Sequence, residues 1–237
     1  MKPYLTLKEG VILKRLFIAS LLAALILTSI LSFAGVTPVF AGAGETFATE
    51  VTKRINPDMD EFVFRLESYE DEYWRYTKTI TIVDAKNDNV IQTLVTNEFN
   101  DGEYASTNTY ENPGLIFEDM NFDGYDDIRI VAFTPPGPNI PYICWLWDND
   151  TRQFVHDADL SAVLSLEVDK ENEWISSFAR DGASRYRTEY HRWADGKLKL
   201  FKAIDVRYDD DDTEETVTWE LKDGELVETG RTKEKLK

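Results

Sequence analysis

Residues 79–94, TITIVDAKNDNVIQTL, decide the fold class of this chain. Two segments in which β-branched apolar residues recur at every second or third position flank the polar centre at residues 87–89. Alternation with a period of two is typical of a β-strand that buries one face. Asn and Asp favour tight turns because they tolerate a left-handed backbone. The stretch therefore predicts two antiparallel strands joined by a turn.

The same pattern continues on both sides of this stretch. Further strand-like runs lie at residues 62–66, 128–133 and 142–147. Asp-Gly pairs, which suit tight hairpin turns, occur at residues 101–102, 181–182, 195–196 and 223–224. The only good helix candidate is residues 158–166, with Asp157 or Asp159 as its N-cap. We expect an all-β fold, either an antiparallel sandwich or a small propeller-like domain.

Two segments that each begin with tryptophan resemble each other, residues 193–198 and residues 219–226. They predict two hairpins of one design, which suits a sandwich or a propeller-like stack. Residues 62–237 are expected to form the all-β domain, and residues 42–61 a looser segment before it.

Residues 1–41 have the order of features of a secretory signal peptide. The positive charges of Lys14 and Arg15 precede an apolar run at residues 16–35, and small residues follow at 41–43. The run is also about as long as a membrane-spanning helix, roughly 20 residues. A retained N-terminal anchor is therefore the alternative to a cleaved signal. In either case we expect export, to the periplasm or to the cell surface or the extracellular space.

Charge and composition narrow the class of function. The formal net charge of −18 repels phosphate groups, which excludes nucleic acid and anionic lipid as expected partners. It favours cations or a basic protein. The single cysteine, Cys144, permits no intrachain disulfide and lies in an apolar run, as a buried structural thiol does. His156 and His191 are the only histidines, which leaves little material for a catalytic centre, and we expect no enzyme.

Residues 119–127, DMNFDGYDD, contain the sharpest motif of the sequence. Oxygen-bearing side chains stand at its positions one, three, five and nine, and glycine stands at position six. This spacing matches the start of an EF-hand calcium loop, in which alternating oxygens surround the ion. The candidate calcium ligands are the side chains of Asp119, Asn121, Asp123 and Asp127, the last directly or through water, and the backbone carbonyl of Tyr125.

The flanks of this loop differ from those of an EF-hand. Position twelve, which holds a bidentate glutamate in an EF-hand, is Ile130, and both flanks are strand-like. The sequence therefore predicts a calcium loop between β-strands that replaces the missing disulfides as a structural clip. An ordinary acidic turn is the alternative.

Two expectations concern burial. Trp145 and Trp147 share one face of their strand and Cys144 faces the other way, so one of these sets is expected to be core. The acidic run at residues 209–215 is expected to be a solvated loop between two strands.

The motifs together resemble a known group of proteins. Residues 117–127 are similar to the D-x-N-x-D-G-x-x-D calcium loop of FG-GAP and integrin-type β-propeller blades. The succession of this loop, the aromatic strand at 142–147 and the motifs at 180–183 and 190–193 resembles exported bacterial proteins related to periplasmic I-type lysozyme inhibitors. Some members are immunity proteins against peptidoglycan-cleaving effectors of rival secretion systems. The likeness covers roughly residues 115–201.

This resemblance implies a calcium-stabilised β fold and a loop that enters a glycosidase cleft. The group often presents a Ser-Gly-x-Tyr motif, for which residues 183–186 are the nearest match here, without the glycine. Ser184, Arg185 and Tyr186 are therefore the candidate partner-binding residues. Tyr186 could equally be one rung of an alternating strand.

Two functions follow as alternatives. The first is an inhibitor or immunity-type protein that binds a basic cell-wall hydrolase. The second is a calcium-dependent adhesion or carbohydrate-binding module at the cell surface.

Overall fold

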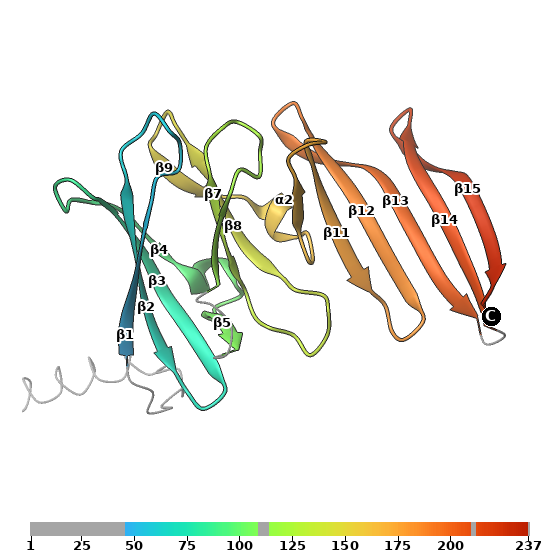
Figure 1. The fold of residues 1–237 in the computed structure, drawn as a ribbon, viewed down its shortest axis with the longest axis horizontal. Helices are drawn as coiled ribbons and strands as arrows, with labels where there is room; N and C mark the ends of the chain where they lie inside the picture. Colours follow the sequence, from blue (N-terminus) through green and yellow to red (C-terminus); the bar gives the residue numbers. More distant parts are fainter. Residues whose placement is uncertain (1–45, 109–113, 210–211, 237) are drawn as a thin grey trace, which may run out of the picture. The chain divides into compact units, whose positions relative to one another are not determined.

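The computed structural model describes residues 46–108, 114–209 and 212–236. Within them it confirms an all-β, antiparallel fold (Figure 1). The predicted signal segment, residues 1–41, lies outside the described residues. The described residues belong to one compact unit, in which the strands form three sheets. Strands pair with near neighbours in the chain, and the middle and C-terminal sheets are meanders. In the N-terminal sheet the strand Ala105–Asn108 leaves this order, because it pairs with Trp74–Asp84 and not with the strand just before it.

The N-terminal sheet consists of β1 (Thr46–Lys53), β2 (Phe62–Glu70), β3 (Trp74–Asp84), β4 (Val90–Val95) and β5 (Ala105–Asn108), with the 3-10 turn η1 (Thr96–Phe99) between the last two. The middle sheet consists of β6 (Leu115–Glu118), β7 (Asp127–Val131), β8 (Tyr142–Asp148) and β9 (Gln153–His156). A short helix, α2 (Ala158–Ser161), precedes the C-terminal sheet. That sheet consists of β10 (Glu167–Asp169), β11 (Trp174–Arg180), β12 (Arg185–Ala194), β13 (Lys197–Asp209), β14 (Thr213–Lys222) and β15 (Glu225–Lys235).

The stretch that decides the fold forms the predicted strand pair. Strands β3 and β4 are antiparallel, with Ile80 opposite Leu94. Asp88 lies in the turn between them at φ 60°, a conformation that Asp tolerates better than most residues. The Asp-Gly pairs at 195–196 and 223–224 likewise form the β12–β13 and β14–β15 turns, with positive φ at both residues.

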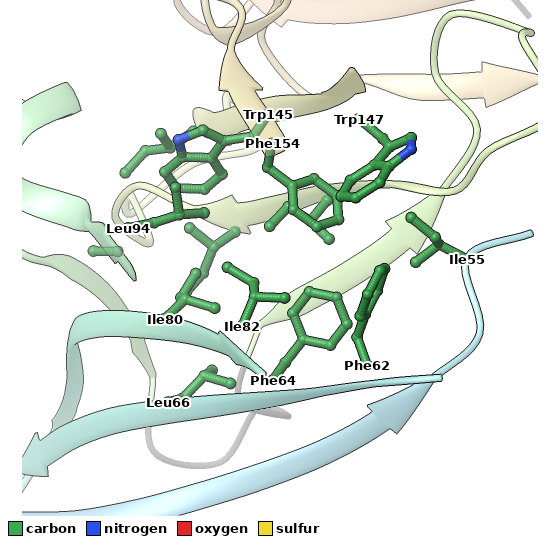
Figure 2. Close-up of a cluster of buried hydrophobic side chains, with 14 of the residues drawn as sticks. Ile55, Phe62, Phe64, Leu66, Ile80, Ile82, Leu94, Trp145, Trp147 and Phe154 are labelled. Atoms are coloured by element: carbon green, nitrogen blue, oxygen red, sulfur yellow. The ribbon is translucent and has the colours of Figure 1, made fainter. Parts of the chain in front are cut away.

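Side chains from the N-terminal and middle sheets share the larger hydrophobic core (Figure 2). Phe62 packs against Trp147 with ring centroids 5.5 Å apart, and Phe64 packs against Phe154 at 5.8 Å. These two sheets therefore form the expected sandwich, because their apolar faces are buried against each other.

Strand β8 has both faces buried. Trp145 and Trp147 lie in the larger core, whereas Cys144, on the opposite face, lies in a second core with Leu160 and Ile175. The expectation of one core set is confirmed for the tryptophans, and the opposite face is buried as well. The reason is that α2 and the C-terminal sheet supply apolar residues to the second core, which covers the other face of the strand.

Two segments differ from expectation. The segment expected to be looser contains β1, which pairs along its length with β2, from Thr46 opposite Tyr69 to Lys53 opposite Phe62. Helix α2 is shorter than predicted, although the cap at Asp157 is confirmed because its carboxylate accepts the Leu160 N–H at 2.7 Å.

In the acidic run at residues 209–215, residues 210–211 lie outside the described residues, Asp209 ends β13 and residues 213–215 begin β14. Glu215 belongs to β14 and is buried, 8% exposed. Its carboxylate lies 2.5 Å from Arg231, 3.5 Å from Arg207 and 3.6 Å from Lys233. The expectation of solvation fails here because three cations on adjacent strands replace water around this acid.

In the part of the chain that the structure describes, no helix is long and apolar enough to cross a membrane.

Candidate functional site

The acidic loop, residues 119–127, connects β6 to β7. Its side-chain oxygens accept hydrogen bonds from its own backbone. The Asp119 carboxylate accepts the N–H groups of Asp123 (3.1 Å) and Gly124 (2.9 Å). Asn121 Oδ1 also accepts the Asp123 N–H (3.2 Å), and Asp123 Oδ1 accepts the Tyr125 N–H (2.9 Å). These bonds hold the alternating oxygens of the motif in one tight turn.

Backbone conformation explains the glycine of the motif. Gly124 has φ 90°, a region that disfavours residues with a side chain. A Cβ added at Gly124 would meet no atom within 4 Å. The glycine is therefore required for the shape of the backbone and not for space around it.

Asp127 differs from the other acids of the loop because it is fully buried. Its two carboxylate oxygens accept the N–H groups of Met120 and Trp147, each at 2.8 Å. Burial raises the pKa of Asp127 to about 8, although the two hydrogen bonds act against this, and the charges of Asp123 and Asp119 raise it further. Asp127 thus joins the loop to β8.

The acidic loop also connects all three sheets. The Asn56 amide donates to the Gly124 carbonyl (2.8 Å), and Lys53 at the end of β1 pairs with Asp126 (2.8 Å). From the C-terminal sheet, the Trp193 indole donates to the Met120 carbonyl at 2.8 Å. The sequence motif did not predict these partners. The one sequence feature that marked Trp193 was its position in one of the two similar tryptophan hairpins.

The donor set of the loop fits calcium in part. Asp119, Asn121 and Asp123 offer hard oxygens on one turn, and Tyr125 can add its carbonyl, as calcium requires. Among the residues that the structure describes, no three His, Cys, Asp or Glu side chains converge as ligands of one metal ion. The physical reason is that the Asp127 oxygens point to backbone amides in the interior.

The three candidate partner-binding residues lie at the β11–β12 tip, residues 181–184, and at the start of β12. Arg180 closes this tip: its guanidinium donates to the carbonyls of Gly182 (2.8 Å) and Ala183 (3.3 Å). The Ser184 carbonyl accepts the Tyr208 N–H at 2.8 Å. The backbone of the tip is therefore held by its own side chains and by β13.

Arg185 and Tyr186 point to opposite faces of the sheet because they are neighbours in one strand. The Arg185 side chain is 66% exposed, and its ion pair with Asp181 is long, 3.5 Å. The Tyr186 ring is half-buried between Phe178 and Tyr208, both at 5.8 Å between centroids. The structure thus places Tyr186 as a rung of β12 and leaves Arg185, beside the half-buried Ser184, as the exposed member of the set.

A second loop meets this tip. The side-chain amide of Asn139, in the loop between β7 and β8, bonds the backbone of Arg180. It accepts the backbone N–H of Arg180 (2.7 Å) and donates to the backbone carbonyl of Arg180 (2.9 Å). The sequence reasoning missed Asn139, although the preceding Pro-Pro-Gly-Pro run marks an exposed turn.

Comparison with known proteins identifies a shared fold. No family model matches the chain, and no curated protein matches it. A solved structure described as a Xanthomonas type IV secretion system related protein is similar over 78% of this chain and 99% of that one. The TM-score is 0.57 at 15% sequence identity, so the likeness concerns the fold alone.

Proposed function

We propose that this chain is an exported, calcium-stabilised binding protein that inhibits a lysozyme-like peptidoglycan hydrolase by placing the β11–β12 tip in the cleft of the enzyme. The observation that carries the proposal is the fixed backbone of this tip beside an exposed Arg185. A preorganised element loses little conformational freedom on binding. The fold is also similar to that of a protein described as related to a type IV secretion system.

The chemistry of such a cleft suits Arg185. Glycoside hydrolases carry a pair of carboxyl groups at the cleavage site, and arginine forms charge-assisted hydrogen bonds with carboxylates. The pair between Arg185 and Asp181 is long and exposed, so it is weak and Arg185 is able to change partner. Tyr186 supports the tip from the other face of the sheet, where Arg180 stacks on its ring at 5.3 Å.

The net charge of −18 serves the same role over a longer range. Lysozymes are usually basic, and opposite net charge increases the rate of encounter. Since this attraction acts at long range, added salt should slow association and leave dissociation nearly unchanged.

Calcium has a structural role in the proposal. Asp119, Asn121 and Asp123 would hold the ion with the carbonyl of Tyr125, and Asp127 would anchor the loop beneath it or reach the ion through water. The support is the arrangement of these oxygens on one turn, where a cation would meet the two carboxylates of Asp119 and Asp123. Because Lys53, Trp147 and Trp193 all contact this loop, an ion bound there would stabilise the contacts among all three sheets.

The test is the rate at which a panel of lysozyme-type enzymes clears a suspension of cell walls, with and without a molar excess of the purified protein. We expect at least one enzyme to be inhibited, and Arg185→Ala to raise the dissociation rate of that complex. Lys222→Ala, at the exposed end of β14, is the control for loss of one positive charge. If no enzyme is slowed and the protein sediments with purified peptidoglycan, the carbohydrate-binding alternative replaces this function.

A further inference from the structure

We propose that the proline loop, residues 133–140 between β7 and β8, is a second contact element that packs on the uncharged rim of the same enzyme cleft. This inference rests on the proposed function and names a further part of its interface. The first observation is compositional. Residues 130–147 contain no charged side chain, although 30% of the residues in the chain are charged. Both strands beside the loop are buried in the cores, whereas the loop itself reaches the surface.

Phe133 is the exposed apolar residue of this loop, with 49% of its surface accessible. It directly follows Ala132, which is buried. An aromatic ring gains more than most side chains from being covered by a partner, and aromatic residues are enriched among those that dominate binding energy. Pro136, Gly137 and Pro138 next to it are exposed as well. The loop thus presents an apolar surface without charge.

Three sets of hydrogen bonds hold the base of the proline loop. The Ala132 N–H donates to the Pro141 carbonyl at 2.9 Å and closes the loop. Ser165, in the segment after α2, makes two hydrogen bonds to the proline loop. The Ser165 hydroxyl donates to the Pro138 carbonyl, and the Ser165 N–H donates to the Ile140 carbonyl at 2.7 Å. The Asn139 amide adds the two bonds to Arg180. Proline also fixes φ, so the loop has little freedom to lose on binding.

The bonds between Asn139 and Arg180 define where the proline loop lies. Arg180 is the last residue of β11 and closes the β11–β12 tip. The two loops therefore lie side by side, and both are at the lower edge in Figure 1. The acidic loop lies at the other end of the five-residue strand β7, about 17 Å away at 3.3–3.4 Å per residue. A partner can thus contact both neighbouring loops and leave the calcium loop free.

Charge decides which partner surface fits each loop. The tip carries Arg185, which suits the acidic floor of a glycosidase cleft. The proline loop carries no charge that could pair with a charged group of the partner, and such a group would lose its water if the loop covered it. The loop therefore fits an apolar part of the partner, namely the rim beside that floor. The arrangement of an apolar anchor next to a charged contact is common in protein interfaces.

The test compares Phe133→Ala with Val155→Ala, in the enzyme complex that the wild-type protein forms. Val155 is the matched control because it is 50% exposed and lies on β9. We expect Phe133→Ala to weaken binding about tenfold or more, through faster dissociation, and Val155→Ala to bind as the wild type does. Phe133→Tyr should restore most of the affinity. Asn139→Ala should also speed dissociation, because it releases the proline loop from the tip.

The outcomes separate the two proposals. If the wild-type protein inhibits no enzyme of the panel, the proposed function fails and this inference fails with it. If the wild type inhibits an enzyme and Phe133→Ala binds as tightly as Val155→Ala, the proline loop is not a contact element and the inhibitory function stands. Phe133 is exposed and its change decides the question even if Asn139→Ala does not fold.

Discussion

The indole N–H of Trp193 donates a hydrogen bond to the carbonyl of Met120 at 2.8 Å, across 73 positions of sequence. Met120 is fully buried in the acidic loop, and Trp193 lies in β12 of the C-terminal sheet. This bond therefore couples the candidate calcium loop to the sheet that carries the candidate partner-binding tip. Removing the donor of a buried carbonyl lowers the free energy of unfolding more than removing the donor of an exposed one, because no water replaces the hydrogen bond.

Trp193→Phe is the first prediction. The change keeps the ring and removes the donor, so we expect the free energy of unfolding to fall by about 1–3 kcal/mol. Urea unfolding followed by circular dichroism measures it. Trp219→Phe is the control, since Trp219 donates to the Asp205 carboxylate at 2.7 Å in the same sheet but away from the loop. We expect calcium to protect the control as well as the wild type and to protect Trp193→Phe less. Equal protection of all three proteins would show that the bond does not connect the sheet to the acidic loop.

The second prediction concerns removal of calcium. Binding to the native state alone stabilises by about 2.7 kcal/mol when the free ion is at a hundred times its dissociation constant. A chelator should therefore lower the melting temperature of the wild-type protein by several degrees. Asp123→Ala should abolish the response, whereas Glu72→Ala, an exposed acid in the β2–β3 turn away from the loop, should keep it. Magnesium should substitute poorly because it prefers a smaller octahedral shell. If the wild type melts at one temperature with calcium and with chelator, the loop is an acidic turn only.

The third prediction concerns pH and Glu215. The hydrogen bond with Arg231 holds the pKa of Glu215 below its usual range, and Lys233 lowers it further. The native state therefore favours the charged form more than the unfolded chain does. This contribution is present above the ordinary glutamate pKa and is lost as the pH falls through the lowered native pKa. We expect Glu215→Gln to be less stable than the wild type at pH 7 and equal to it at pH 2–3. Amide exchange in β15 should be faster in the variant at pH 7, and a stability difference that persists in acid would contradict this account.

Cys144 provides the fourth prediction. The thiol is fully buried, and burial raises its pKa to about 12. Since the thiolate is the form that reacts, we expect Cys144 to resist alkylation by iodoacetamide at pH 8 in the native protein and to react in denaturant. Val155→Cys is the matched control with an accessible thiol. Rapid modification of Cys144 without denaturant would show that β8 opens in the native state.

Most of the longer strands could be predicted from local patterns because they carry their own alternation and turn residues. Residues 79–94 illustrate this: the apolar residues and the turn around Asp88 specify β3, β4 and their pairing without help from elsewhere. The segment that contains β1 was missed because its apolar alternation is weak, and its strand conformation depends on eight pairings with β2.

The site was predictable to the extent that it is contiguous. The acidic loop is one motif, so its oxygens could be read from spacing. The burial of Asp127 depends on Trp147, 20 positions away, and the fixation of the tip depends on Asn139, 41 positions before Arg180. Such partners leave no periodic signal in the sequence. For the same reason Glu215 was expected in a solvated loop, since its cations lie on other strands.

The pairing of strands that are near in the chain has a consequence for the order of assembly. Because every strand pairs with a near neighbour in the chain, a polypeptide that emerges from its N-terminus can complete one sheet before the next exists, and no strand waits for a distant partner. The acidic loop is the exception. Its contacts come from Asn56, ahead of the second strand, and from Trp193, in the last sheet. The contacts around this loop can therefore form only after nearly the whole chain has been synthesised. An ion bound there would stabilise the molecule only after all three sheets have formed.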